Sequence, residues 1–256
     1  MRIATYNIWN DNRGGELRKR QIIEAIRSAD ADVIGLQEVS PQFFHEELER
    51  LYPHAAFRAY AGEDEGLAIL SRYLIAASTW LHEMPEHDNS AALNAVLEVD
   101  GRRISVTDLH LPWDSAIQKE RQIVAIDRFV HQQEADVHVL LGDFNGSTNS
   151  SVHRFLLGEQ TLLGCEANPY WYELSSTYAA VKGLPLPPTL DFLRNPRWGG
   201  RNTTEIPYAA DRIYVMLRDG ADHLRYVARF GLAVLPESGL AASDHYGVAA
   251  DIELEE

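Results

Sequence analysis

The sequence is poor in cysteine, in long apolar runs and in positive charge. Cys165 is the single cysteine among 256 residues, so no disulfide can form within the chain. That usage fits a reducing compartment, and we expect a cytoplasmic protein. No apolar run approaches the ~18 residues of a transmembrane helix. The first residues show no basic segment followed by an apolar stretch and a cleavage site, so we expect no secretory signal.

The deficit of positive charge excludes one class of partner. The chain has 23 Lys and Arg against 38 Asp and Glu, and its formal net charge is −15 at pH 7. Proteins that bind long duplex DNA usually carry a basic footprint, because neutralised phosphates supply most of the non-specific affinity. We therefore expect no stable binding of long duplexes, although a local basic patch can still hold a single phosphate.

The chain is long enough and apolar enough for one α/β domain over residues 1–256. Hydrophobic residues make up 45% of it, and no linker, repeat or low-complexity tract divides it. We expect a monomer. The stretch of about 158–210 is different, because prolines, glycines and aromatic residues cluster there without a sustained period. We expect an irregular loop region on the substrate side of the protein.

Apolar periodicity and turn residues predict the remaining elements. The predicted helices cover 16–29, 41–51, 115–133 and 150–157, with Ser115 and Asn149 as N-terminal caps. The predicted strands cover 2–8, 32–39, 66–72, 74–79, 91–100, 102–111, 136–145, 211–217, 223–235 and 245–254. Asp100-Gly101 indicates a hairpin. Two groups of strands with interspersed helices indicate two sheets packed face to face, with helices outside.

Polar residues stand at the ends of these strands, where neighbouring strands bring side chains to one rim. They are Asn7, Glu38, His110, Asp143, Asn145, Asp211, Asp244 and His245. Burying so many carboxylates without partners costs several kcal/mol each, and a cation or phosphate among them removes that cost. The set suits Mg²⁺ and phosphoester hydrolysis, with one histidine acting on water and another on the phosphate or the leaving group.

Seven segments carry a resemblance to a known group of proteins. They are "TYNIW", "LQEV", "GLAILSR", "TDLHL", "GDFN", "DRIYV" and "SDHYGV", and they span residues 5–248. Their order resembles that of the endonuclease/exonuclease/phosphatase superfamily, which includes pancreatic-type deoxyribonuclease, apurinic endonucleases and sphingomyelinases. The resemblance implies a four-layer αββα sandwich of two mostly antiparallel sheets flanked by helices. It also implies Mg²⁺- or Mn²⁺-dependent cleavage of a phosphoester by in-line attack of water.

The resemblance assigns a metal site to two of these segments and to the C-terminal Asp-His pair. Glu38 in "LQEV" matches the principal metal ligand, and Asn7 in "TYN" lies beside it. Asp244 matches either a second metal ligand or the partner of the histidine that follows it.

The same resemblance assigns the catalytic side chains. His110 matches the histidine that contacts the phosphate or serves as acid, and Asp211 matches the acid that supports His110. Asp143 and Asn145 match the pair that orients the nucleophilic water and the phosphate. His245 matches the terminal histidine, a base or a phosphate ligand.

One cationic segment, "RNPRWGGRN" at 194–202, allows two interpretations. Arg194, Arg197 and Arg201 could pair with phosphate while Trp198 stacks on a ring, or the segment could be a surface loop anchored by its Trp. If it binds substrate, Arg197→Ala and Trp198→Ala raise KM more than they lower kcat. We expect the arginine at position 18, on the polar side of a helix, to face solvent.

Three functions are open from the sequence. The first is a phosphodiesterase or phosphatase acting on a small or locally exposed phosphoester. The second is a DNA-processing enzyme, either an endo- or exonuclease or a protein similar to tyrosyl-DNA phosphodiesterases. The third is a non-catalytic binding protein on the same fold, although such proteins typically lose a ligand or a histidine that this chain retains.

Overall fold

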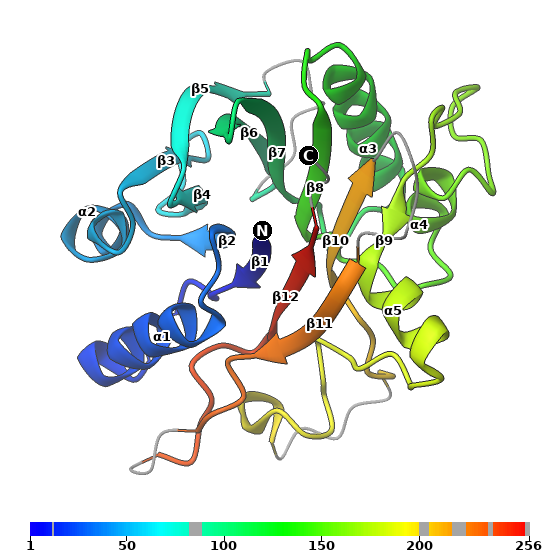
Figure 1. Ribbon diagram of the computed structural model, residues 1–256. Coiled ribbons are helices and arrows are strands. Elements are labelled where there is room, and N and C mark those ends of the chain that lie inside the picture. The colour runs from blue at the N-terminus through cyan, green and yellow to red at the C-terminus, as the bar shows by residue number, and fades with distance from the viewer. Residues whose placement is uncertain (12, 82–88, 200–204, 217–223, 235–237, 254–256) are drawn as a thin grey trace.

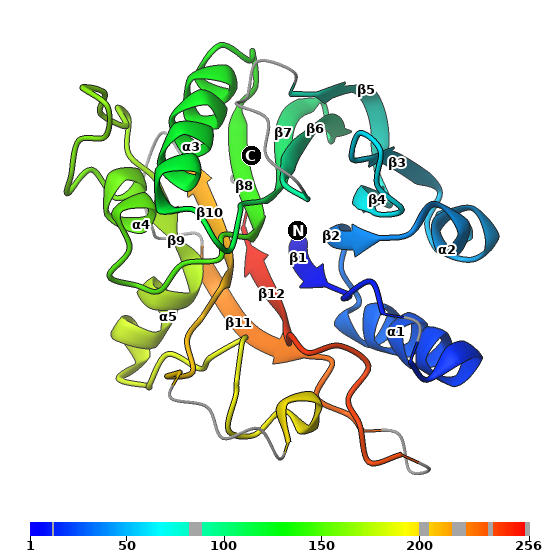
Figure 2. The ribbon, with the colours of Figure 1, turned by 180° about the vertical axis from the view of Figure 1, so that it is seen from behind.

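Two six-stranded sheets pack face to face in the computed structural model, which describes residues 1–11, 13–81, 89–199, 205–216, 224–234 and 238–253. Helices α1 (Gly15–Ala29) and α2 (Pro41–Glu46) lie outside one sheet (Figure 1). Helices α3 (Ala116–His131) and α4 (Ser151–Leu156) lie outside the other, and the view from behind separates the two groups of helices in the same way (Figure 2). The expected αββα sandwich is therefore confirmed.

The strands run mostly antiparallel, as expected. The first sheet has the order β11-β12-β1-β2-β4-β3 and the second the order β5-β6-β7-β8-β10-β9. Among the described strands, only the pairs β1–β2 and β7–β8 are parallel. The bounds are β1 Arg2–Asn7, β2 Val33–Val39, β3 His54–Ala59, β4 Gly66–Ser71, β5 Leu74–Trp80, β6 Ala91–Val99, β7 Arg102–His110, β8 Val137–Asp143, β9 Tyr172–Glu173, β10 Asp211–Met216, β11 Leu224–Phe230 and β12 Gly247–Ile252.

Two apolar clusters hold the layers together. One fills the space between the sheets and continues to α3, where Ile123 and Ile126 are fully buried. The other covers the outer face of the first sheet, where Ile22 of α1 and Phe43 of α2 pack on the strands. Each such side chain contributes about 1.5–3 kcal/mol when it leaves water. At the rim of the sheets this packing continues through Ile8, Leu111 and Phe144, and polar residues stand between these apolar side chains.

Local signals account for most boundaries. Ser115 caps α3 by accepting from the Gln118 N–H at 3.3 Å, as predicted. Asn149 is not the cap of α4, because Ser150 accepts from the His153 N–H at 3.2 Å. Asp100 has φ 50° and the glycine after it φ 81°, the two left-handed residues of a tight hairpin.

Three elements depart from the sequence prediction. The region 158–210 is not wholly irregular, since it contains β9 and the helix α5 (Leu174–Lys182), which packs against β10 and β11. The short strand β3 was not expected. The predicted helix over 41–51 ends at Glu46 and is followed by a 3-10 turn at Leu48–Arg50. Within the described part of the chain, no helix is both long and apolar enough to cross a bilayer.

Candidate active site

Three adjacent strands place their polar ends side by side. His110 at the end of β7 lies opposite Asp143 at the end of β8, and Asp211 at the start of β10 lies opposite Asp143 from the other side. Gly142 makes this close approach possible. It has φ 137°, and a Cβ atom there would lie 1.9 Å from the Leu109 carbonyl oxygen.

The first sheet contributes a second pair of side chains to the same place. Asn7 ends β1, and its Nδ2 donates to Glu38 Oε1 at 2.9 Å and to Asp143 Oδ2 at 3.0 Å. Glu38 has a left-handed φ of 57° where the pairing of β2 with β4 is irregular, which gives this residue an orientation that a regular strand would not. The fully buried Asn7 therefore links the two sheets across the site.

Asn7 differs in one respect from the expected metal ligand. Its Oδ1 accepts from the Trp9 N–H at 2.9 Å, so the amide nitrogen faces the two carboxylates. An amide nitrogen donates hydrogen bonds and does not ligate a hard cation. In this arrangement the Asn7 side chain is hydrogen-bonded to both carboxylates and to the Trp9 backbone.

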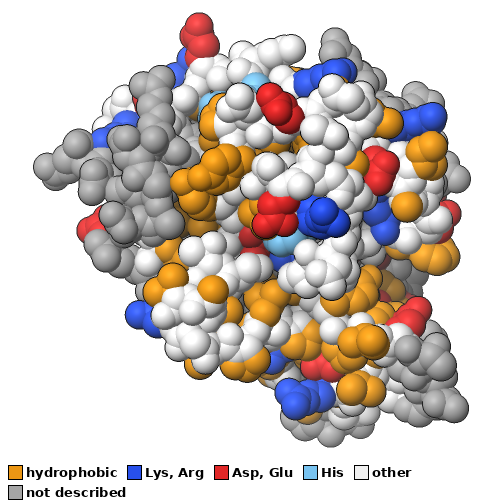
Figure 3. Space-filling model, turned by 90° about the vertical axis from the view of Figure 1, so that its right-hand side faces the viewer, with side chains coloured by type: hydrophobic (Ala, Val, Ile, Leu, Met, Phe, Trp, Pro, Cys, Tyr) orange, Lys and Arg blue, Asp and Glu red, His pale blue; other side chains and the backbone are white. Residues whose placement is uncertain are grey.

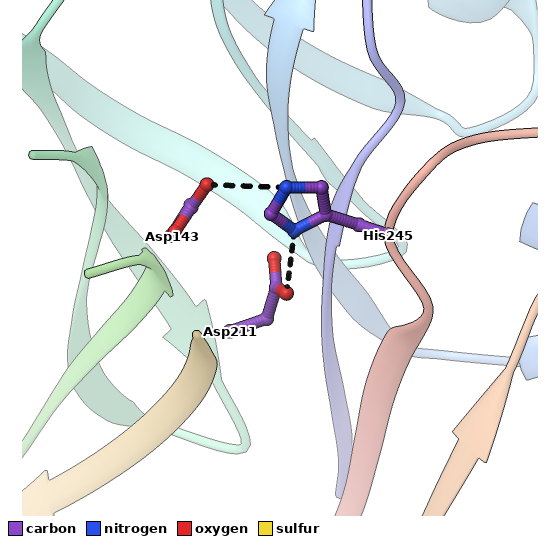
Figure 4. Close-up of side chains that lie close together, drawn as sticks. All are labelled: Asp143, Asp211 and His245. Atoms are coloured by element: carbon purple, nitrogen blue, oxygen red, sulfur yellow. Dashed lines mark hydrogen bonds and ion pairs between the residues drawn. The ribbon is translucent and has the colours of Figure 1, made fainter. Parts of the chain in front are cut away.

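His245 and Asp211 form a buried dyad. His245 Nδ1 donates to Asp211 Oδ2 at 2.8 Å, and its Nε2 lies 3.8 Å from Asp143 Oδ2, so the two carboxylates face opposite ring nitrogens (Figure 4). Burial alone would lower the pKa of His245, but Asp211 and then Asp143 outweigh it and raise that pKa well above its usual value. The imidazole is therefore well suited to hold a proton at Nε2, facing Asp143.

This geometry corrects the role expected for Asp211, which supports His245 and not His110. The Nδ1 of His110 lies 3.1 Å from the hydroxyl of Tyr60, a buried residue that the sequence analysis did not single out. Its Nε2 lies 3.7 Å from Asp143 Oδ2 and 3.9 Å from Glu38 Oε1. The two histidines therefore flank Asp143, each with a different partner behind it.

The carboxylates around these histidines are crowded. Burial, followed by the charges of Glu38, Asp143 and Asp211, raises the pKa of Asp244 to about 6. Burial and the charge of Glu38 likewise raise the pKa of Glu65, a residue not singled out from the sequence, to about 7. Hard oxygen donors in such excess suit a divalent cation such as Mg²⁺ or Mn²⁺.

One oxygen–nitrogen cluster close enough to surround an ion is formed by Asp143, Asp211 and His245, whose ligand atoms lie within 4.8 Å of one another. However, His245 Nδ1 is already engaged with Asp211. The more open carboxylate is Glu38, which is half-buried. The rim therefore offers two sets of donor atoms, the buried cluster and the half-buried Glu38 carboxylate.

Asn145 is held at the rim by three hydrogen bonds. Its backbone N–H donates to Asp143 Oδ1 at 2.8 Å, and its Nδ2 donates to the Leu111 carbonyl at 2.9 Å. Its own carbonyl accepts from Lys119 Nζ at 2.6 Å. Burial lowers the pKa of Lys119, while the charge of Asp143 opposes that shift. Lys119 of α3 is therefore a cationic group beside the site, and no sequence motif indicated it.

The arginine-rich segment is tied to the protein backbone. Arg197 Nε donates to the Ala241 carbonyl at 2.6 Å, and Trp198 Nε1 donates to the Asp244 carbonyl at 3.1 Å. Arg194 is exposed, and Arg201 lies outside the described residues.

Arg18 does not face solvent, contrary to expectation. It is 6% exposed, and its Nε donates to the Ala242 carbonyl at 2.6 Å. Its Nη atoms donate to the carbonyls of Ile8, Trp9 and Asp11. All three nitrogens of the guanidinium therefore donate to backbone oxygens.

The fold and the site agree with a match to a family model. The model described as "Endonuclease/Exonuclease/phosphatase family" matches residues 4–245. The chain belongs to this family. Members of the endonuclease/exonuclease/phosphatase family are generally phosphoester hydrolases. No curated protein matches the chain.

Solved structures similar to the chain share the whole fold at low sequence identity. TDP2 of D. rerio, complexed with single strand DNA product, is 15% identical with a TM-score of 0.77, covering 99% of both chains. An endonuclease/exonuclease/phosphatase from Bacteroides vulgatus is 19% identical with a TM-score of 0.74, covering 99% of this chain and 98% of its own. A conserved protein from Enterococcus faecalis V583 is 21% identical with a TM-score of 0.73, covering all of both chains.

Proposed function

We propose that the chain is a phosphoester hydrolase that depends on Mg²⁺ or Mn²⁺ and acts by in-line attack of water. The observation that carries this proposal is the convergence of Glu38, Asp143 and the Asp211–His245 dyad at one rim, with His110 on the other side of Asp143. Two imidazoles facing one carboxylate from two sides suit a reaction in which protons are moved at both ends of a bond.

Glu38 and Asp244 would hold the cation, and Asn7 would fix the position of Glu38 through the 2.9 Å hydrogen bond. Burial, with a smaller effect of Glu38, Asp143 and Asp211, raises the pKa of Asp244 to about 6, and a bound cation would stabilise its charged form. When bound, a divalent cation neutralises charge on phosphoryl oxygens and assists the leaving oxygen.

Asp143 would orient the attacking water. The two histidines would act on the proton and on the phosphate or leaving group. His245, with the Asp211 carboxylate behind it, is suited to hold or accept a proton at Nε2. His110, with the Tyr60 hydroxyl behind it, would contact the phosphate or the leaving group. Asn145 would hold Asp143 in place through its backbone N–H and contact the phosphate from the rim.

The substrate we favour is a small or locally exposed phosphoester, because the net charge of −15 opposes long polyanions. A DNA-processing enzyme is the second candidate. The observation in its favour is the similarity to D. rerio TDP2, whose structure holds single strand DNA product. Retention of Glu38 and both histidines argues against the non-catalytic alternative.

Hydrolysis of bis-p-nitrophenyl phosphate tests the proposal. We expect turnover with Mg²⁺ or Mn²⁺, none with EDTA, and none by the Glu38→Ala protein with its fold intact. A panel of abasic DNA, tyrosyl-DNA, sphingomyelin, inositol phosphates and nucleotides then identifies the substrate class. If the wild-type protein cleaves none of these with either metal, the proposed function is wrong.

A further inference from the structure

The chain in front of His245 is neither helix nor strand, and its carbonyl groups have unusual partners. Four consecutive carbonyls, from Ala241 to Asp244, each accept a hydrogen bond from a side chain. The donors form a set that we call the carbonyl clamp, and they are Arg197 for Ala241, Arg18 for Ala242, Asn195 for Ser243 and Trp198 for Asp244, at 2.6, 2.6, 3.0 and 3.1 Å.

Burial makes these hydrogen bonds necessary. Ala241, Ala242 and Ser243 are 0–1% exposed, and Asp244 is 8% exposed. A buried carbonyl without a donor costs about 1–3 kcal/mol, and this segment has no strand ladder to supply donors. The clamp therefore supplies hydrogen-bond donors to the carbonyls of an irregular segment. This segment leads into Asp244 and His245, whose side chains lie at the site.

The segment is also fixed from the side of the active site. Ser243 Oγ donates to the Asn7 carbonyl at 2.7 Å and accepts from the His245 N–H at 3.1 Å. His245 itself forms an isolated β-bridge with Leu190. Movement of the four carbonyls would therefore move the His245 ring relative to Asp211.

We propose that Asn195, Arg197 and Trp198 are positioning residues, which hold the Ser243–His245 segment so that His245 meets Asp211 and Asp143. Arg197 Nη2 is buried, its Nε donates to the Ala241 carbonyl, and the guanidinium carbon lies 5.4 Å from the centroid of the Trp9 ring, so these parts of the guanidinium face the protein. Trp198 packs edge-on against Phe192 at 4.9 Å between ring centroids. This inference rests on the proposed hydrolase function. For Arg197 and Trp198, it replaces substrate binding as the role.

Trp198→Phe tests the clamp, because it keeps an aromatic ring at this position but removes the N–H that donates to the Asp244 carbonyl. We expect kcat for bis-p-nitrophenyl phosphate to fall about 10-fold or more, with KM within about twofold, since only the placement of a reacting group changes. The control is Trp171→Phe, which removes an indole N–H that donates to Asp127 Oδ1 of α3 at 2.9 Å. We expect it to lower the melting temperature at least as much, because Trp171 is fully buried, and to leave kcat unchanged.

A second measurement does not depend on activity. The Nδ1–H of His245, bonded to buried Asp211, should give a downfield proton resonance in the wild type and in Trp171→Phe, and a broadened or absent one in Trp198→Phe. If the Trp198 protein does not fold, Arg197→Met, which keeps most of the stem and removes the donor to Ala241, takes its place.

A raised KM with unchanged kcat would assign this segment to substrate binding and overturn the inference. Unchanged kinetics together with an unchanged resonance would overturn it as well. A wild-type protein without hydrolase activity would refute the proposed function only, since the resonance still reports whether the clamp places His245.

Discussion

At the residue scale, the two histidines differ in what stands behind them. A carboxylate supports His245, whereas a phenol hydroxyl supports His110. A carboxylate fixes the tautomer of an imidazole and stabilises its charged form, and a neutral hydroxyl does so far less. The two imidazoles therefore differ in the group at hydrogen-bond distance from Nδ1, a carboxylate for His245 and a hydroxyl for His110.

Asp211→Asn should lower kcat by about 10²–10⁴-fold with little change in KM, because His245 loses its tautomer and the stabilisation of its proton. Double variants identify which histidine is affected. In the His245→Ala background the Asp211 change should add almost nothing, and in the His110→Ala background it should add nearly its full loss. The reverse pattern would return Asp211 to His110.

His153 gives a pH-dependent contribution to stability away from the site. It is buried with Nδ1 2.8 Å from the Tyr214 hydroxyl, and burial, with a smaller effect of Arg212, lowers its pKa to about 4. The unfolded chain therefore binds the proton first as pH falls, so this contribution is complete above the usual pKa of about 6.5 and is lost between 6.5 and 4. The melting temperature should fall less steeply over that range in His153→Phe than in the wild type. Parallel curves would contradict this.

At the scale of elements, the helix α5 joins the irregular region to the site strand β10. Glu173 accepts from the N–H groups of Ser175 and Ser176 at the start of α5. The same carboxylate lies 3.5 Å from Arg212 of β10, and both side chains are 1% exposed. The buried Glu173 carboxylate therefore caps the N-terminus of α5 and also balances the charge of the Arg212 guanidinium, which is adjacent to Asp211 in β10.

Glu173→Gln should lower the free energy of unfolding by about 3–5 kcal/mol, because it leaves a buried guanidinium without its charge partner. In a domain of this size the melting temperature should fall by roughly 6 °C or more. Glu16→Gln, at an exposed carboxylate paired with Lys19 on α1, is the control and should change little. Equal small effects would show that the buried pair contributes nothing to stability.

Sequence patterns predicted the elements that carry their own signals. The "GDFN" and "DRIYV" segments read as strand ends, and their polar residues do meet at one rim. Helix α5 escaped prediction because it has nine residues, lies close to prolines, and is capped by Glu173, a residue type that rarely caps. The choice of His245 over His110 as the partner of Asp211 depends on how the sheets pack, so no single strand could reveal it.

At the scale of the whole molecule, the net charge of the chain favours the small phosphoester that we propose as substrate over a long polyanion. The net charge is −15, and Lys and Arg stand in separate patches among the described residues on the face in Figure 3. We expect random duplex DNA to bind more weakly than about 1 µM at physiological salt, by fluorescence anisotropy. Submicromolar binding would favour a nuclease. Tighter binding of a single strand than of a duplex would favour the DNA-processing alternative.

The most direct test of a cation-dependent site is calorimetric titration of Mg²⁺ into the wild type and Glu38→Gln. Glu98→Gln, at an exposed carboxylate on β6, serves as the control. We predict that Glu38→Gln weakens Mg²⁺ binding by about tenfold or more, while its melting temperature in EDTA stays that of the wild type. The control should bind Mg²⁺ as the wild type does. Unchanged Mg²⁺ affinity in Glu38→Gln would contradict the account.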